Sequence, residues 1–299
     1  MAAGRYLWTP VPICNAGGEP ADADAAIGQC AKMPIAETIR DRRGLADRRG
    51  GGKRIEELTA AIEQGQVEIL FQPQFASAGN RLVGAEALSR WNHPRLGRIG
   101  IEALFDIAER CGRAGELTSH IAIRALTVAG TWPEHLRLSV NISAADLLDD
   151  NFASTILAAL TVADFDPQRL TIEITEQALV SELDRSSIQL ERLSRRGIRI
   201  ALDDFGAGFC NFRYLKHLPL DGLKLDRSMI EGVVDDERDR AVLRGIVAMA
   251  WALGLWVVAE GIETEEQRLA IAREGCEKWQ GFLGGAPMPA KEFAAFAAR

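Results

Sequence analysis

Short apolar runs, each closed by polar or charged residues, alternate with helical patterns from residue 54 to the end of the chain. Runs typical of buried strands fall at 68–75, 82–91, 136–143, 170–176, 198–204, 222–226, 256–260 and 278–283. Patterns with a helical period lie between most of them, at 101–113, 115–130, 145–160, 178–196, 235–254 and 265–274. Strands separated by helices predict βαβ units and a largely parallel sheet.

The number and spacing of these runs predict a barrel. Eight strands spread over about 245 residues are typical of a (β/α)8 fold, whose active site lies where the strands end. Only SAGNRL separates the first two runs, which is too short for a crossover between parallel strands. We therefore expect an α/β fold that starts with an antiparallel hairpin, namely a modified (β/α)8 TIM-like barrel with one antiparallel strand.

The first 52 residues differ from the rest of the chain. They are rich in Ala, Gly and Arg and show no sustained period beyond a short helical pattern at 33–43. The Arg-rich end of this segment is typical of a solvated linker. The sequence therefore predicts a flexible N-terminal tail or linker over residues 1–52 and one barrel domain over residues 53–299.

Charge and composition narrow the functional classes. The net charge of −7 and the pI near 5.3 disfavour a binder of polymeric nucleic acid, which needs a basic face. The five cysteines include no CxxC pair, so neither a disulfide framework nor a zinc–thiolate site is indicated. The sequence also lacks a long apolar run and the pattern of a signal peptide. These features predict a cytoplasmic protein without a transmembrane segment.

Polar and charged residues recur near the carboxyl ends of the strand-like runs. They are Glu86, Asn141, Glu173, Glu176, Asp203, Asp204, Lys224, Asp226, Glu260 and Glu263. A buried carboxylate is costly to desolvate, and several at one edge of a barrel would repel one another unless cations lay between them. Oxygen ligands without a histidine or cysteine cluster favour Mg²⁺ or Mn²⁺ over zinc or copper. Because the adjacent Asp203 and Asp204 can each reach a different ion, the pattern suits a site for two divalent cations.

The basic residues near these strand ends are Lys224, already in this set, and Arg90. Lys224 and Asp226 are two positions apart in a strand and share a face, which allows an internal ion pair, a role in the site, or both. Arg90 lies on the same face as Glu86, where its guanidinium could clamp a phosphate oxygen or pair with a neighbouring acid. The residues alone leave these alternatives open.

Eight ordered motifs resemble those of a known family. FQPQF, GAEALSRW, SVNIS, IEITE, ALDDFGAGF, LKLDRS, VVAEGIET and QGF are similar to the motifs of the EAL domain of bacterial cyclic di-GMP phosphodiesterases. The family takes its name from the triplet that stands here as Glu86, Ala87 and Leu88, and the resemblance covers roughly residues 55 to 299. It implies a modified barrel with one antiparallel strand, two divalent cations (Mg²⁺ or Mn²⁺), and hydrolysis of one phosphodiester of cyclic di-GMP to linear pGpG.

The resemblance also implies roles for individual residues. The first cation would be held by Glu86, Asn141, Glu173 and Asp203, and the second by Asp203, Asp204 and Glu260. Lys224 would orient and deprotonate the attacking water, with Glu260 as the alternative general base. The nucleotide would be contacted by Gln72, Arg90, Asp226, Glu263 and Gln280. Glu176 would brace the loop after Asp204, through which family members couple metal binding to formation of a homodimer.

The loop after Asp204 departs from the family pattern. Similar active enzymes usually read DDFGTGYSS, whereas the variable positions here are Ala207, Phe209, Cys210 and Asn211. Cys210 and Asn211 replace hydroxyls that would order the loop, so we expect weaker coupling between the dimer interface and the metals.

Two other functional classes compete with hydrolysis. A degenerate barrel can act as a non-catalytic cyclic di-GMP receptor, but such receptors have usually lost metal ligands, and every expected ligand is present here. The composition also admits a metal-dependent barrel that abstracts a proton next to a carboxylate. The motifs favour the phosphodiesterase.

Overall fold

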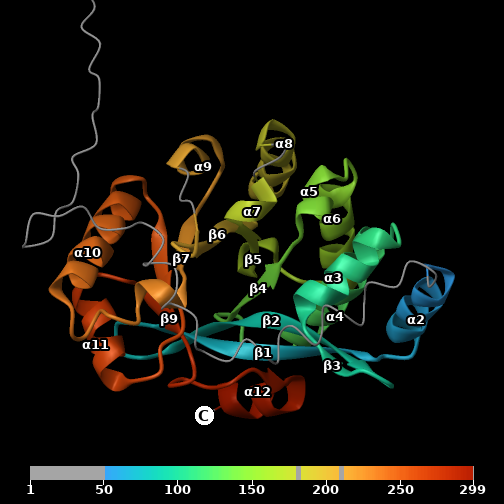
Figure 1. Ribbon diagram of the computed structural model, residues 1–299, viewed down its shortest axis with the longest axis horizontal. Helices are drawn as coiled ribbons and strands as arrows, with labels where there is room; N and C mark the ends of the chain where they lie inside the picture. The colour runs from blue at the N-terminus through green and yellow to red at the C-terminus, as the bar shows by residue number, and fades with distance from the viewer. Residues whose placement is uncertain (1–50, 180–182, 209–211, 299) are drawn as a thin grey trace, which may run out of the picture. The chain divides into compact units, whose positions relative to one another are not determined.

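A barrel forms the main part of the computed structural model, which describes residues 51–179, 183–208 and 212–298 (Figure 1). Within these residues, eight strands close into the barrel. They are Val67–Ala76 (β1), Leu82–His93 (β2), Arg137–Asn141 (β4), Leu170–Thr175 (β5), Arg199–Phe205 (β6), Gly222–Leu225 (β7), Trp256–Ala259 (β8) and Lys278–Gln280 (β9). The order β1-β2-β4-β5-β6-β7-β8-β9 returns to β1, so the predicted modified (β/α)8 barrel is confirmed.

Strand β1 is the antiparallel strand of the barrel. It pairs with β2 on one side, where Gln72 lies opposite Glu86, and with β9 on the other, where Gln74 lies opposite Gln280. All other neighbours within the barrel run parallel. The connection from β1 to β2 includes residues 79 and 80 with φ values of 74° and 50°, the left-handed conformation that glycine and asparagine tolerate in tight turns. The short SAGNRL segment therefore produces the hairpin that its length predicts.

Two short strands were not predicted. Gly97–Ile99 (β3) pairs with the end of β2, and Met288–Pro289 (β10) pairs with β1. The predicted run 278–283 is also shorter in the structure, because the chain turns away after β9. A Cβ on Gly281 would lie 2.1 Å from the carbonyl oxygen of Ile262, so only glycine allows the two backbones to approach at this turn.

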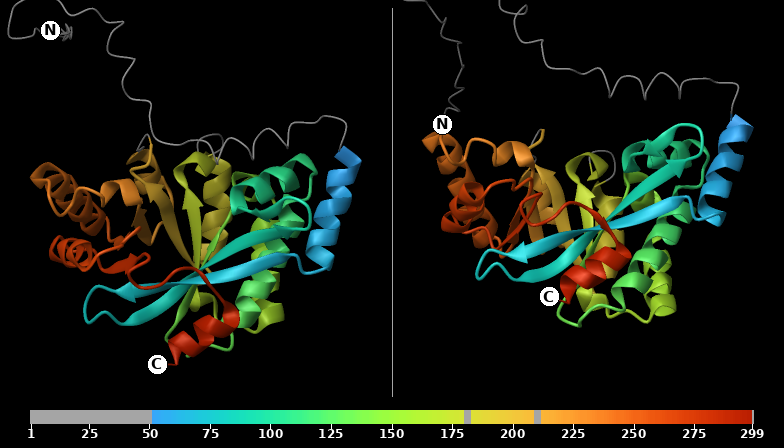
Figure 2. Two further views of the ribbon diagram at one scale, coloured as in Figure 1. Left: turned by 60° about the horizontal axis from the view of Figure 1, so that its bottom comes forward. Right: turned by 90° about the horizontal axis from the view of Figure 1, so that it is seen from below.

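Helices follow most strands and cover the outside of the barrel (Figure 2). They are Gly51–Glu63 (α2), Ile101–Arg110 (α3), Ala114–Ala129 (α4), Ala144–Leu148 (α5), Phe152–Ala163 (α6), Glu176–Leu179 (α7), Leu183–Ser194 (α8), Phe212–His217 (α9), Glu237–Ala252 (α10), Glu265–Arg273 (α11) and Ala290–Ala297 (α12). Two single turns of 3₁₀-helix are Pro167–Arg169 (η1) and Arg227–Met229 (η2). Helices α2, α9 and α12 were not predicted.

The predicted helix over 145–160 is two helices in the structure. Helix α5 ends at Leu148 because Asp149 takes an extended ψ of 119° and its carboxylate accepts a hydrogen bond from the backbone N–H of Asn151. Such local side-chain bonds compete with helical pairing. The predicted helix over 178–196 corresponds to α7 and α8, whose connection at 180–182 lies outside the described residues.

The C-terminal helix covers the outer face of β1, which has no crossover helix of its own (Figure 1). Phe293 of α12 is fully buried, with its ring centroid 6.0 Å from Phe71 of β1 and 4.5 Å from Trp132. The rings of Phe71 and Trp132 meet edge to face at 5.1 Å. This aromatic contact closes the barrel on its antiparallel side.

The N-terminal tail predicted from the sequence falls almost entirely outside the described residues. Residues 1–50 lie outside the described residues, so the predicted tail, its short helix at 33–43 and the boundary at residue 52 stay predictions. In the part that the structure describes, no helix combines the length and the apolar character needed to cross a bilayer.

Candidate active site

Polar side chains from successive strands meet inside the barrel at the end where the parallel strands finish. They come from Glu86 on β2, Asn141 on β4, Glu173 on β5, Asp203 on β6, Lys224 on β7 and Glu260 directly after β8. Side chains alternate along a strand, so each of these residues has neighbours that point outward into the helical layer. Glu86, Asp203, Glu173 and Lys224 are buried, the last two each 1% exposed, whereas Asn141 and Glu260 are half-buried.

Lys224 lies at the centre of this group. Its Nζ lies 2.7 Å from Glu173 Oε2, 2.8 Å from Glu260 Oε1, 3.1 Å from Asp203 Oδ2 and 3.4 Å from Glu86 Oε2. The internal ion pair considered for Lys224 therefore forms, but with these four acids instead of Asp226. One ammonium group thus connects four acids that lie in or directly after four different strands. These contacts hold the four carboxylates close together.

Amide side chains from β4 and β9 hold Glu86 in place, and two amides of β1 hold the one from β9. Asn141 Nδ2 donates a hydrogen bond to Glu86 Oε1, and Gln280 Nε2 donates one of 2.7 Å to Glu86 Oε2. Gln280 also donates to Gln72 Oε1 at 2.9 Å and accepts a bond of 3.0 Å from Gln74 Nε2. Gln74 was not predicted as a site residue. Its signal in the sequence is its position two residues after Gln72 in FQPQF, which puts both amides on one face of β1.

Burial and mutual repulsion make most of these carboxylates weak acids. Burial raises the pKa of Glu173 to about 8, and the charges of Glu86 and Asp203 add to the rise while Lys224 opposes it. Burial and the neighbouring Asp203 raise the pKa of Asp204 to about 6. Burial likewise raises the pKa of Asp203, although Lys224 opposes the rise. These groups bind protons readily, which means that they also favour any other positive charge placed among them.

The pKa values of Glu260, Glu86 and Lys224 also depend on burial and on the charges around them. Burial raises the pKa of Glu260 well above its usual value, against the charge of Lys224. For Glu86 burial acts in the same direction, but Lys224 and the bonds from Gln280 and Asn141 hold the pKa below its usual value. Burial would lower the pKa of Lys224, yet its four acidic neighbours raise it well above the usual value.

Asp204 has an unusual backbone that brings two adjacent carboxylates to one place. Its φ of 56° is left-handed, and the register of β6 against β7 shifts between Leu202 and Phe205. In a regular strand, the side chain of Asp204 would point away from that of Asp203. In this conformation each of the two carboxylates has an oxygen within 4.8 Å of a Glu260 oxygen and of the other. Strained residues of this kind are typical of functional sites.

The acids form two groups that could each hold a divalent cation. Glu86, Glu173 and Asp203 make the first group and Asp203, Asp204 and Glu260 the second, each with carboxylate oxygens within 4.8 Å of one another. Asn141 lies beside the first group through its bond to Glu86. Four carboxylates contact one ammonium group, with the more exposed Asp204 beside them, and such an excess of negative charge is stable only with protons or cations. The donors are all hard oxygens, so the residues fit divalent cations.

A small cavity opens beside Glu260. It has a volume of about 190 Å³ and is lined by Gln72, Arg227, Glu260, Gly261, Glu263, Gln280, Gly281 and Phe282. The guanidinium of Arg227 pairs with Glu263 at 2.8 Å, and Phe282 is 64% exposed. The predicted residues Gln72, Glu263 and Gln280 thus line one cavity. Arg227 and Phe282 were not predicted, although they directly follow Asp226 and the Gln–Gly pair of the last motif.

Three predicted residues lie apart from the buried acids. Asp226 directly follows β7 and caps η2, where its Oδ1 accepts a bond of 2.9 Å from the backbone N–H of Ser228. Arg90 Nη1 donates to the carbonyl oxygen of Ser89 at 2.8 Å, and its charge acts on Glu86 through space. Glu176 is buried at the start of α7, directly after β5. Their proposed roles, like those of the other site residues, stay predictions.

The altered loop cannot be compared with the structure, because Phe209, Cys210 and Asn211 lie outside the described residues. The described part of the loop ends with Gly206, Ala207 and Gly208. The expectation of weaker coupling through this loop therefore stays a prediction from the sequence.

The sequence of this chain is similar to those of known proteins. Residues 55–287 match the family model described as the EAL domain. MucR of Pseudomonas aeruginosa, a bifunctional diguanylate cyclase/cyclic di-GMP phosphodiesterase, is 34% identical over 245 residues, which cover 81% of this chain and 36% of MucR. The cyclic di-GMP phosphodiesterase NbdA of the same organism is 37% identical over 240 residues, which cover 78% of this chain and 30% of NbdA. The chain thus spans about a third of the length of these two curated relatives.

The fold is also found among solved structures. The PaMucR phosphodiesterase in its c-di-GMP complex matches this structure with a TM-score of 0.74 and 34% sequence identity. The match covers 81% of this chain and 99% of that chain. The similarity therefore extends over a complete barrel.

Proposed function

Because the chain belongs to the EAL-domain family, we propose that it is a metal-dependent phosphodiesterase that hydrolyses cyclic di-GMP to linear pGpG. The observation that carries this proposal is the buried group of acids around Lys224 at the carboxyl end of the barrel. The two acidic groups share Asp203, which supports two ions, and their oxygen donors support Mg²⁺ or Mn²⁺. The names of NbdA and MucR support the choice of substrate.

The proposal assigns four ligands to one cation and three to the other. One cation would be held by Glu86, Asn141, Glu173 and Asp203, and the other by Asp203, Asp204 and Glu260. Bound cations would neutralise the phosphodiester and acidify the attacking water. Asn141 and Gln280 would keep Glu86 oriented for this task through their hydrogen bonds to its two oxygens.

In this proposal, Lys224 and Glu260 are the candidates to take the proton of the attacking water. Lys224 would orient the water and Glu260 is the alternative general base, as the sequence suggested. The two groups lie 2.8 Å apart, so a proton accepted by one can pass to the other. With cations among the acids, the carboxylates that now raise the pKa of Lys224 would be neutralised, and its pKa would fall towards the working range.

The nucleotide would lie over the cavity beside Glu260. Gln72 and Gln280 offer amides, and Glu263 offers a carboxylate, which together can donate to and accept from the edge of a guanine base. Arg90 would clamp a phosphate oxygen, and Asp226 would contact the nucleotide from the end of β7. Glu176 would brace the loop after Asp204. A homodimer and a cytoplasmic location belong to the same proposal.

The proposal is tested by incubating purified protein with cyclic di-GMP and Mg²⁺ or Mn²⁺ and separating the products by chromatography. We expect linear pGpG to form with either ion and to be absent with chelator. Tight binding of cyclic di-GMP without any product under these conditions would identify a non-catalytic receptor instead.

A further inference from the structure

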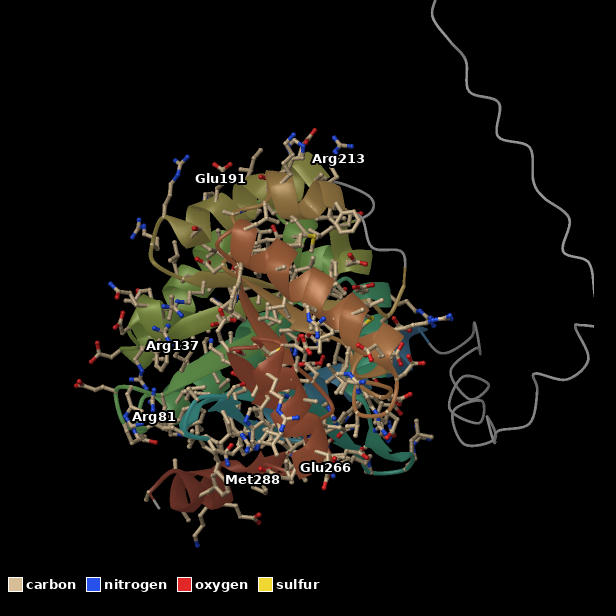
Figure 3. All side chains as sticks on the ribbon, turned by 90° about the vertical axis from the view of Figure 1, so that its left-hand side faces the viewer. Arg81, Arg137, Glu191, Arg213, Glu266 and Met288 are labelled. Atoms are coloured by element: carbon tan, nitrogen blue, oxygen red, sulfur yellow. The ribbon has the colours of Figure 1, made fainter. Side chains whose placement is uncertain are left out.

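A cluster of cations lies at the opposite end of the barrel, where the parallel strands begin. Arg137 starts β4, Arg199 starts β6 and Lys278 starts β9. Each lies two or four positions before Asn141, Asp203 or Gln280, and therefore shares the inward face of its strand with a residue of the active site. Arg81, just before β2, lies on the same side of the barrel as Arg137 (Figure 3).

These cations face one another without enough acceptors. Within the described part of the chain, Arg199 and Lys278 have no hydrogen-bond acceptor and no ion pair, and all three side chains are half-buried. Arg137 donates to the carbonyl oxygen of Gln168. Burial, followed by the charges of Arg199 and Arg137, lowers the pKa of Lys278 to about 8. Burial and Arg199 likewise lower the pKa of Arg137.

The nearby acids do not relieve this repulsion by direct contact. Asp166 acts on Arg137 through space, and Glu173 and Glu277 act on Lys278. Asp166 accepts the backbone N–H of Gln168, and Glu277 accepts the backbone N–H of Val257 and the indole N–H of Trp251. None of the three forms an ion pair with the cations in the described residues. The cations therefore remain available to an external anion.

Trp256 completes the cluster and limits the kind of ligand. Its ring lies under Lys278 Nζ, which is 4.0 Å from the ring centroid. A Cβ on Gly222 would lie 2.3 Å from the same ring, so the indole also packs on the Gly222 backbone. With the ammonium and the backbone both against its ring, Trp256 is poorly placed to stack a nucleobase. Its Nε1 is buried without an acceptor in the described part of the chain. The side chains thus offer only donors and positive charge.

We propose that this amino-end cluster, made of Arg137, Arg199, Lys278 and Trp256, binds a compact phosphate-type oxyanion. The ligand is either inorganic phosphate or the phosphomonoester of a small metabolite. Guanidinium and ammonium groups that lack partners bind such an oxyanion through charge-assisted hydrogen bonds. The site is distinct from the acidic centre, whose own charge repels anions.

The test follows thermal unfolding of the full chain in chelator, so that no added anion can act through metals at the acidic end. Sodium phosphate, glycerol 3-phosphate and sodium chloride are compared at matched ionic strength. We expect phosphate to raise the Tm and the effect to saturate at millimolar concentration, whereas general salting-out keeps growing with concentration. A larger shift with glycerol 3-phosphate identifies a phosphomonoester as the ligand class, and a shift with phosphate alone identifies the free ion.

A matched pair of variants separates binding from structure. Arg199→Gln should weaken phosphate binding at least about tenfold, because it removes a charged donor from the site. Arg195→Gln changes an arginine that directly follows α8 and is 80% exposed, and it should leave the response unchanged. Without phosphate, Arg199→Gln should unfold at the same temperature as the wild type or higher, since it removes repulsion. If Arg199→Gln fails to fold, Lys278→Gln serves in its place.

Four results would overturn the proposal. One is an identical response to phosphate and chloride. Another is an undiminished phosphate response in both Arg199→Gln and Lys278→Gln. The third is a phosphate response that appears only with Mg²⁺, since this would place the anion at the acidic end of the barrel. A large loss of stability in Arg199→Gln together with no phosphate response in the wild type would show that these cations only offset the buried carboxylates.

Discussion

Replacing Lys224 by methionine should destabilise the metal-free protein strongly. The ammonium is 1% exposed and lies within 3.4 Å of four carboxylate oxygens. At an effective dielectric constant of about 20, each contact near 3 Å contributes roughly 5 kcal/mol of attraction. Desolvation and proton uptake by the acids offset most of this sum. Removing one partner from a buried charge network typically costs about 3–5 kcal/mol, which we expect here.

The assay is thermal unfolding followed by circular dichroism, with chelator and with saturating Mg²⁺. For a domain of this size, a loss of about 3–5 kcal/mol lowers the Tm by roughly 6–20 °C. Lys291→Met is the control, because Lys291 is an exposed lysine on α12. Mg²⁺ should narrow the gap between wild type and Lys224→Met, since bound cations replace the missing positive charge among the acids.

Two outcomes would refute this reasoning. If Lys224→Met unfolds in chelator at the wild-type temperature, the carboxylates do not need the ammonium and are already neutral in the folded protein. If Mg²⁺ stabilises both proteins equally without narrowing the gap, the cations bind somewhere other than the acids around Lys224.

Three further predictions follow from the same site. Ca²⁺ takes more ligands at longer distances than Mg²⁺ and acidifies bound water less, so it should inhibit turnover; equal rates with the two ions would contradict a tightly held pair of cations. In chelator, the free energy of unfolding measured with urea should fall as the pH rises from about 5 to 8. In the folded protein the pKa of Glu173 is about 8, against 4.5 ordinarily, and that of Asp204 is about 6, against 3.8. Over this pH range both groups therefore hold protons that the unfolded chain has released. Saturating Mg²⁺ should remove that slope, and a flat profile in chelator would disprove the shifts. The double change Cys210→Ser, Asn211→Ser should lower the Mg²⁺ concentration that gives half the maximal rate, and an unchanged midpoint would show that both positions are neutral.

The barrel could be predicted because its signals are local. Each parallel strand is a short apolar run, and the five-residue connection after β1 dictates an antiparallel partner. The parts that were not predicted depend on contacts far apart in the sequence. Helix α12 exists where it does because Phe293 fills a site made by Phe71 and Trp132, and β10 pairs with β1 across more than 200 residues. The pattern within residues 288–297 is compatible with a short helix but does not specify either contact.

The same division holds for the candidate site. Parallel strands finish at one edge, so the acids at their ends could be grouped from the sequence alone. Gln74 was missed because its contact with Gln280 depends on the register of β1 against β9. Arg227 was missed because its pairing with Glu263 joins two loops. The left-handed backbone of Asp204 was also beyond prediction, since aspartate rarely adopts it without tertiary support.

The most direct test of the central claim compares cyclic di-GMP turnover by wild type, Glu86→Gln and Glu68→Gln with Mg²⁺, with pGpG measured by chromatography. Glu86 is a proposed metal ligand with both oxygens held by amides. The control residue Glu68 on β1 is 36% exposed and contacts Arg98 and Asn92, away from the acids around Lys224. The account predicts pGpG from wild type and Glu68→Gln, and at least about a hundredfold slower formation by folded Glu86→Gln, a barrier increase of about 2.7 kcal/mol. If Glu86→Gln kept more than about a tenth of the wild-type rate, equivalent to less than about 1.4 kcal/mol, the acids around Lys224 would not be the catalytic metal site.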